Sequence, residues 1–346
     1  MTKHEIMIAN SNSLSNIQDK TINLIVTSPP YPMIDIWDSV FIKQNKNIAD
    51  YLAHHEALRA FNEMHNLLNK TWLECDRILS ESGFICINIG DAVRTIGDKF
   101  QMFSNHTQII NFFSKMGYSV LPDIHWRKPS NAPNKFMGSG MYPAGAYVTY
   151  EHEYILIFRK GGKRIFKGDE KKKRQKSAYF WEERNIWFSD LWEIRGVSQN
   201  IKNIKNSKAL RNRNASFPFE IPYRLINMYS SEGDTVLDPF MGFGTTIRAC
   251  MVANRNSIGI EIDPVIANMA IESLNISLDD LNRVIEKRIE NHLNFINGLS
   301  PEKKSECYTN IPYGFPVKTK QETVLKIDKI SDISIQDNTI LCYYEQ

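Results

Sequence analysis

The chain has 346 residues, 42% of them hydrophobic and 23% charged, so it can bury a large core in one α/β domain with an inserted lobe or in two small domains. No apolar run approaches the roughly 20 residues that a membrane-spanning helix needs, and the N-terminus carries no signal-peptide pattern. The five cysteines are scattered and never spaced as C-x-x-C, which argues against a disulfide framework and a structural zinc site. We therefore expect a reduced, cytoplasmic protein with no membrane partner.

Buried strands and helices alternate along the first half of the chain. Residues 22–27 form a short apolar run that stops at Ser-Pro-Pro-Tyr, which predicts a buried strand ending in a turn. Apolar residues at helical spacing predict helices over about 49–79 and about 106–115, and apolar runs predict strands over 84–89, near 118–126 and over 154–158.

Positive charge is concentrated in residues 159–213, which hold 17 Lys and Arg against 6 Asp and Glu, whereas the whole chain has a net charge of +3. The rest of the chain therefore carries −8, and one basic segment on a mildly acidic body is typical of a polyanion-binding protein. Aromatic residues also occur here, and disordered linkers are poor in them: Tyr179, Phe180, Trp181, Trp187, Phe188 and Trp192. A folded lobe that contacts nucleic acid is favoured, with a solvated linker as the alternative.

The second half continues the alternation. It predicts a helix over 220–228, a strand over 235–237, a glycine-containing loop, a helix over about 246–253 and a strand over 257–260. Strands that alternate with helices predict a mostly parallel sheet covered on both faces. Beyond residue 276 the pattern predicts a charged amphipathic helix to about Gly298 and a strand-like end over 323–344, to which we assign no role.

The loop over residues 238–246, Asp-Pro-Phe-Met-Gly-Phe-Gly-Thr-Thr, lies between a predicted strand and a predicted helix. Glycines allow a sharp turn and a close approach to a ligand. Asp238 ends its strand where open α/β sheets bind ligands, and Glu261 ends the next strand, where an acidic side chain can accept hydrogen bonds from ribose hydroxyls. A dinucleotide fingerprint would have a third glycine at Ile247, so the pattern favours a nucleoside cofactor without a pyrophosphate.

Ser28-Pro29-Pro30-Tyr31 ends the first predicted strand. Taken alone, Pro-Pro after a strand is a simple turn with Tyr31 as a packing residue. The same residues also suit chemistry on an exocyclic amino group of a base, whose lone pair is delocalised into the ring. The Ser28 side-chain oxygen and the rigid Pro29 carbonyl would accept from its two N–H groups, and Tyr31 would offer a π face to a flipped base.

Together these segments resemble the amino-methyltransferases of bacterial restriction–modification systems. Residues 27–31 resemble their catalytic motif and residues 238–246 their cofactor motif, and the order catalytic motif, basic region, cofactor motif resembles their permuted β group. The resemblance spans residues of about 6–275. It implies a permuted Rossmann-like methyltransferase fold of the α/β class, with a mostly parallel sheet, helices on both faces and a small inserted DNA-recognition lobe. It also implies S-adenosylmethionine as the cofactor and no metal.

The resemblance divides the chain and assigns its residues. It implies a catalytic half over 1–158, a basic target-recognition insert over 159–213, a cofactor-binding half over 214–275, and a C-terminal helix and tail of unknown role over 276–346. The implied catalytic residues are Ser28, Pro29, Pro30 and Tyr31, and the implied cofactor-binding residues are Asp238, Pro239, Phe240, Gly242, Gly244, Thr245, Glu261 and Phe217. Trp37, after Tyr31, is interpreted as a packing residue, with closure over a flipped base as the alternative.

Serine rather than aspartate in the first motif position usually accompanies N4-cytosine enzymes in this family, so Ser28 points to cytosine N4 in double-stranded DNA, with adenine N6 as the alternative. Two positions depart from the family pattern, since Asn10 stands where an acidic residue is usual and Phe243 separates the loop glycines. Neither change removes a group that the chemistry requires. A restriction endonuclease acting on the same DNA site is the partner that such a system implies, and the sequence leaves the oligomeric state open.

Two other classes of protein remain as alternatives. RNA and protein methyltransferases have similar Pro-Pro-Tyr loops, but the late cofactor loop and the basic segment argue against them. A DNA-binding module without activity is disfavoured because Ser28, Tyr31 and the glycine loop are all intact.

Overall fold

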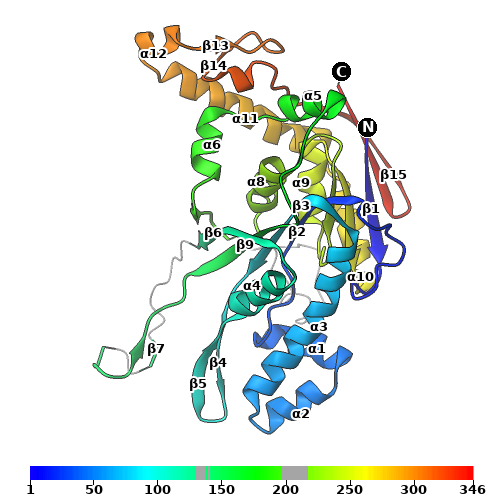
Figure 1. Cartoon of the computed structure of the whole chain (residues 1–346), viewed down its shortest axis with the longest axis vertical. Helices are drawn as coiled ribbons and strands as arrows, with labels where there is room; N and C mark the ends of the chain where they lie inside the picture. The colour runs from blue at the N-terminus through cyan, green and yellow to red at the C-terminus, as the bar shows by residue number, and fades with distance from the viewer. Residues whose placement is uncertain (129–136, 139–140, 197–216, 346) are drawn as a thin grey trace.

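A ten-stranded sheet forms the centre of the part of the chain that the structure, a computed structural model, describes: residues 1–128, 137–138, 141–196 and 217–345 (Figure 1). The strand order is β10-β6-β9-β3-β2-β11-β12-β1-β16-β15. The strands are β1 (Thr2–Ile8), β2 (Ile22–Thr27), β3 (Leu79–Ile89), β6 (Ser119–Arg127), β9 (His152–Arg159), β10 (Leu191–Glu193), β11 (Thr235–Asp238), β12 (Asn256–Glu261), β15 (Ile330–Gln336) and β16 (Thr339–Tyr344). Only β9 and β16 of these run against the others, so the predicted mostly parallel sheet is confirmed.

Helices cover both faces of this sheet because its central strands are apolar on both sides. In β2, Leu24 and Val26 face one hydrophobic core and Ile25 faces the other. The core around Ile25 is covered by α1 (Asp38–Gln44), α2 (Asn47–Ala53), α3 (Ala57–Ile78) and α4 (Asn105–Lys115). The core around Leu24 is covered by α8 (Glu220–Tyr229), α9 (Thr245–Ala253), α10 (Pro264–Leu274) and α11 (Leu278–Asn297). Among the described residues, no helix is both long and apolar enough to cross a bilayer.

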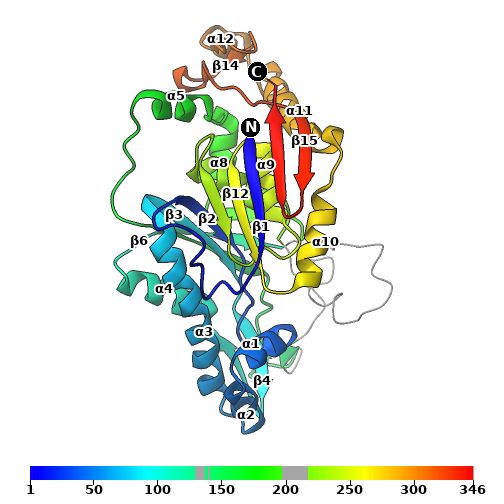
Figure 2. The same cartoon turned by 90° about the vertical axis from the view of Figure 1, so that its right-hand side faces the viewer.

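The C-terminal tail belongs to the same domain. Its strands β15 and β16 extend the sheet beside β1, as Figure 2 shows, and α11 packs against β15 and α9. The remaining short elements are β4 (Ala92–Ile96), β5 (Lys99–Phe103), β7 (Met137–Gly138), β8 (Ala146–Tyr147), α5 (Gly168–Lys176), α6 (Trp181–Trp187), α12 (Pro301–Ser305), β13 (Tyr308–Thr309), β14 (Pro316–Val317), η1 (Asp35–Trp37) and η2 (Lys320–Glu322).

The described part of the basic segment contacts this domain at two places, the amino end of β11 and strand β6. Its helix α5 lies at the amino end of β11, where Arg164 pairs with Asp234 at 2.8 Å and Lys176 pairs with Glu232 at 2.9 Å. Figure 1 shows α5 at the far end of the molecule from the β4–β5 hairpin. The segment then returns through α6 to β10, whose Leu191 pairs with His125 of β6. Residues 197–213 of the segment lie outside the described residues.

Candidate active site

The carboxyl ends of β2 and β11 meet through a direct hydrogen bond. The Thr27 hydroxyl donates to Asp238 Oδ1 at 2.6 Å, and the Thr246 hydroxyl donates to Asp238 Oδ2 at 2.6 Å. Asp238 is only 2% exposed, and this burial raises the pKa of its carboxyl to about 6 despite hydrogen bonds from both threonines and from the Phe240 N–H. The two motifs identified in the sequence therefore end side by side.

The loop after Asp238 turns through two glycines with left-handed backbone, Gly242 at φ 54° and Gly244 at φ 79°. This is the sharp turn that the sequence predicts, and the second glycine precedes the first turn of α9. The Gly242 N–H donates to Glu261 Oε2 at 3.1 Å, and the Asp263 N–H donates to Glu261 Oε1 at 2.9 Å. These bonds place the Glu261 carboxylate at the loop, where burial raises its pKa.

The conformation of the loop also depends on a glycine, which has no side chain, in the neighbouring strand. A Cβ atom added to Gly259 of β12 would lie 2.8 Å from Met241 Cγ and 3.0 Å from Ile247 Cδ1. Met241 therefore occupies the space that a side chain at position 259 would need. Phe243 finds room as well, since it is buried and its carbonyl accepts a hydrogen bond from the Ser273 hydroxyl at 3.2 Å.

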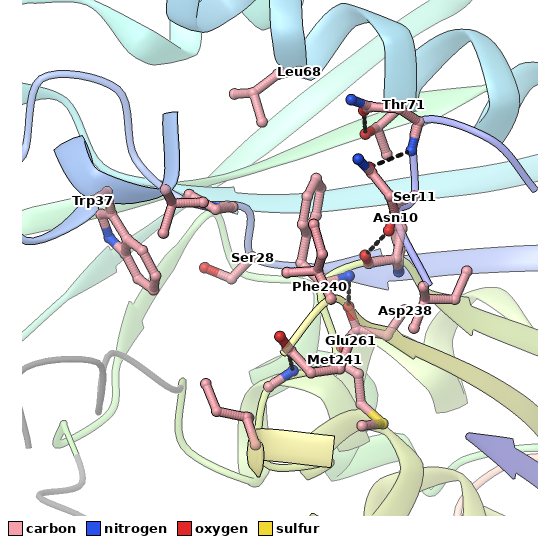
Figure 3. Close-up of a pocket in the computed structure, with 18 of the residues that line it drawn as sticks. Asn10, Ser11, Ser28, Trp37, Leu68, Thr71, Asp238, Phe240, Met241 and Glu261 are labelled. Carbon is pink, nitrogen blue, oxygen red and sulfur yellow. Dashed lines mark hydrogen bonds between the residues drawn. The ribbon is translucent and has the colours of Figure 1, made fainter. Parts of the chain in front are cut away.

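A pocket opens above these strand ends and contains most of the predicted site residues (Figure 3). The predicted residues that line it are Ser28, Pro30, Phe217, Asp238, Pro239, Phe240, Gly242, Thr245 and Glu261. Pro29, Tyr31 and Gly244 lie next to these residues along the chain and are not part of the lining. Ala215 and Ser216, which precede Phe217 in the chain, lie outside the described residues.

Several residues of the pocket carry no assignment from the sequence. Asn10, Ser11 and Asn12 follow β1, which pairs with β12 so that Ile8 lies beside Glu261. The Ser11 hydroxyl donates to the Pro239 carbonyl, which fastens this segment to the cofactor loop. The sequence feature that could have indicated residues 10–12 is a polar triplet after an apolar run. Trp37 packs against the core around Ile25 and also lines the pocket.

Figure 3 shows that the pocket has two chemically different ends, with Ser28 and Trp37 toward one and Asn10, Ser11 and Glu261 toward the other. The end near Glu261 combines a carboxylate with the apolar surface of Phe240. The other end combines a hydroxyl with an indole ring. A ligand with a ribose and an aromatic base that stacks on an apolar surface suits the first end, and a planar ring with polar edges suits the second.

Tyr31 takes part in a hydrogen-bond network that the sequence does not predict. Its hydroxyl lies 2.8 Å from Glu153 Oε2 and 3.2 Å from Ser28 Oγ. Asn88 Nδ2 donates to both the Tyr31 oxygen and Glu153 Oε2, each at 2.7 Å. Burial and the Glu153 charge raise the pKa of the Tyr31 hydroxyl well above its usual value, so the side chain stays a neutral phenol.

Comparisons with known proteins agree with this arrangement. A sequence model of the DNA methylase family, N6_N4_Mtase, matches residues 22–272. The chain is 51% identical over 329 residues to the type II methyltransferase M.MthZI of Methanothermobacter thermautotrophicus, an alignment that covers 94% of this chain and 90% of that protein. It is 46% identical over 286 residues to the type II methyltransferase M.MjaI of Methanocaldococcus jannaschii, covering 80% and 92%.

The fold is also similar to a solved structure. TTHA0409 of Thermus thermophilus, described as a putative DNA modification methylase and solved in complex with S-adenosyl-L-methionine, superposes with a TM-score of 0.60 at 28% identity. The similarity covers 78% of this chain and 93% of that protein. The family match spans both motifs and the strands that bring them together. The chain therefore belongs to the N4/N6 DNA methylase family of restriction–modification systems.

Proposed function

We propose that this protein methylates the exocyclic N4 of cytosine in double-stranded DNA after flipping the base out of the helix, as part of a restriction–modification system. The observation that carries the proposal is the pocket that Ser28 and the loop after Asp238 line together. The hydrogen bond between Thr27 and Asp238 connects the strands that precede these two segments. The choice of cytosine rests on serine at position 28. Adenine N6 is the second candidate, because both bases present the same type of amino group.

The methyl donor is S-adenosylmethionine, the cofactor of this family, and the residues of the pocket fit it. Glu261 keeps carboxylate lone pairs for ribose hydroxyls, since each of its oxygens accepts one backbone hydrogen bond and can accept a second. Phe240 and Ile266 offer apolar surfaces for the adenine ring. When bound, S-adenosylmethionine supplies a methyl group on a sulfonium sulfur, which the amine takes by direct displacement as the sulfur keeps the electron pair of the broken bond.

The target base would enter at the Ser28 end. Ser28 Oγ and the Pro29 carbonyl accept hydrogen bonds from the two amino hydrogens, which directs the nitrogen lone pair toward the methyl group. One amino hydrogen then leaves as a proton to solvent, so the product is neutral. Trp37 is half-buried at this end, where an indole face suits stacking on a flipped base. No covalent intermediate is needed.

DNA contact is assigned to the carboxyl-end side of the sheet. The resemblance assigns target recognition to the basic segment over 159–213. We place it in the part of this segment that follows α5, with β10 as its described point of attachment on this side. Helix α5, which carries the basic run over 171–174, lies at the opposite end and is not assigned to recognition. A restriction endonuclease acting on the same site is the partner that the proposal implies.

Mass spectrometry of nucleosides tests the proposal. DNA of varied sequence is incubated with the protein and S-adenosylmethionine, digested and examined for methylated nucleosides, with Ser28→Ala as a comparison that retains a low but measurable rate. N4-methylcytosine whose amount falls strongly in Ser28→Ala supports the proposal. N6-methyladenine keeps the enzyme class and moves the target to adenine, and the absence of any methylated nucleoside contradicts a DNA methyltransferase.

A further inference from the structure

We propose that Tyr31 and Glu153 orient the Ser28 hydroxyl so that its oxygen can only accept a hydrogen bond from the target amine. Glu153 is thereby a positioning residue that acts through Tyr31 and does not touch the base. The inference deepens the proposed function and rests on it, because it concerns the same amine and the same serine. It applies equally to cytosine N4 and adenine N6, since both amines present N–H groups.

The direction of each hydrogen bond follows from what the groups can donate. An ionised carboxylate has no hydrogen, so the Tyr31 hydroxyl must donate in its 2.8 Å bond with Glu153 Oε2. The Asn88 amide donates to the Tyr31 oxygen at 2.7 Å and to Glu153 Oε2 at 2.7 Å, one hydrogen for each bond. Tyr31 has then used its only hydrogen, and it can interact with another hydroxyl only as an acceptor.

Ser28 is the other hydroxyl beside Tyr31, with its Oγ 3.2 Å from the phenol oxygen. Because the Tyr31 hydrogen is directed to Glu153, the Ser28 hydrogen is the one that fills this bond. The Ser28 lone pairs are left for the pocket that Ser28 lines. A serine hydroxyl that rotated freely would instead point its own hydrogen at the amine in part of the population, where it would repel the amino hydrogens.

Two further contacts keep this chain of hydrogen bonds in place. The Lys128 ammonium forms an ion pair with Glu153 Oε1, so the two carboxylate oxygens have separate partners. A Cβ atom added to Gly90 would lie 3.0 Å from Tyr31 Cε2 and 3.3 Å from Glu153 Cγ, so the bare backbone at position 90 lets both side chains approach. The raised pKa of Tyr31 keeps the phenol hydrogen that the network needs.

The test measures single-turnover methylation with Tyr31→Phe, Glu153→Leu and Glu153→Gln. Tyr31→Phe keeps the ring and removes the acceptor for Ser28, and we expect its rate to fall at least tenfold with unchanged affinity for S-adenosylmethionine. Glu153→Leu should lose a similar factor, whereas Glu153→Gln, which keeps an acceptor oxygen, should lose less. Glu151→Gln is the matched control, because it removes a carboxylate two residues away that pairs with Arg127 at 3.6 Å and is outside the network.

A double-mutant cycle separates orientation from a structural role. In a Ser28→Ala background there is no hydroxyl to orient, so Tyr31→Phe should cause no further loss. A full additional loss in that background, or a wild-type rate for Tyr31→Phe alone, would overturn the inference while leaving the methyltransferase intact. Absence of methylated product from the wild-type protein overturns the proposed function, and the inference with it, since no amine then needs an acceptor.

Discussion

The Thr27 hydroxyl and the Asp238 carboxylate are 2.6 Å apart although 211 residues separate them in the chain. Each is the last residue of a buried parallel strand, so this bond holds the catalytic turn and the cofactor loop at one height above the sheet. Within the described residues, the other donors to Asp238 are the Thr246 hydroxyl and the Phe240 N–H. Loss of one of the three would leave a buried carboxylate incompletely satisfied.

Replacing Thr27 by valine should therefore reduce both stability and cofactor binding. Valine has the same shape but cannot donate, and leaving a buried polar group short of a partner costs about 1–3 kcal/mol. Urea unfolding and calorimetric titration with S-adenosylmethionine measure the two effects. Thr21→Val, whose exposed hydroxyl donates to the Gln18 carbonyl, is the control and should change neither quantity much. Equal behaviour of the two variants would contradict the assigned role of Thr27.

The pKa of Asp238 predicts a specific pH dependence of stability. The folded protein holds this proton up to about pH 6, whereas an unfolded aspartate releases it near its ordinary pKa of 3.8. Between these values the folded state binds more protons, so the free energy of unfolding should fall as the pH rises through the window, by a total of about 3 kcal/mol. Denaturant unfolding from pH 4 to pH 7 should show a flatter curve for Asp238→Asn than for wild type. The exposed Asp98→Asn serves as the comparison, and parallel curves for wild type and Asp238→Asn would refute the assignment.

Glu261→Gln tests the cofactor end of the pocket. The change keeps the size of the side chain but removes the charge, and hydrogen bonds to a charged acceptor are about twice as strong as neutral ones. We expect the dissociation constants for S-adenosylmethionine and S-adenosylhomocysteine to rise together, by about tenfold, because both carry the same ribose. Isothermal titration calorimetry gives both values. Glu272→Gln, on the exposed side of α10, should bind as wild type does.

His292 of α11 connects α6 to the C-terminal tail through one hydrogen bond to each. Its Nδ1 lies 2.8 Å from Glu182 Oε1 and its Nε2 lies 3.0 Å from the Pro316 carbonyl, so both ring nitrogens face acceptors and both bonds require the imidazolium form. Burial opposes this charge, but the two bonds raise the pKa of His292 above its ordinary value. The stability that this contributes is fully present below the ordinary value of 6.5 and is lost as the pH rises through the raised one.

Thermal unfolding between pH 6 and pH 9 measures this effect. Wild type should lose stability over this range more steeply than His292→Gln, and hydrogen exchange in α6 should accelerate in the variant at pH 6. The exposed His54→Gln provides the control. If His292→Gln reproduced the wild-type pH profile, the ion pair between Glu182 and His292 would have no part in fixing α6.

Local sequence features predicted the two motifs because each motif consists only of a strand end and the turn that follows it. The strand before Ser28, the strand before Asp238 and the glycines after it all have signals within a few residues, and the structure places them as expected. The helical pattern over 49–79 is in fact two helices, α2 and α3, separated at His55, which adopts φ 61°. No glycine or proline marks this break in the sequence, so apolar periodicity alone could not locate it.

The residues around Tyr31 escaped prediction for a different reason. Glu153 is 122 residues from Tyr31, and it reaches the site because β9 pairs antiparallel with β3 in one register, in which Asn88 opposes Ile155. A one-residue shift would turn Glu153 to the other face of the sheet. Register between distant strands depends on the packing of the whole domain, and no short segment of sequence contains that information.

The close approach of Met241 to the bare backbone of Gly259 predicts that the two positions vary together among relatives of this chain. A side chain at 259 requires Met241 to shift or to be replaced by a smaller residue, and a smaller residue at 241 alone would leave a hole beneath the loop. Covariation at this pair would therefore report how high the loop sits over the strand. An engineered exchange of bulk between the two positions is a way to tune the depth of the nucleoside end while keeping the Glu261 carboxylate and the two loop glycines unchanged.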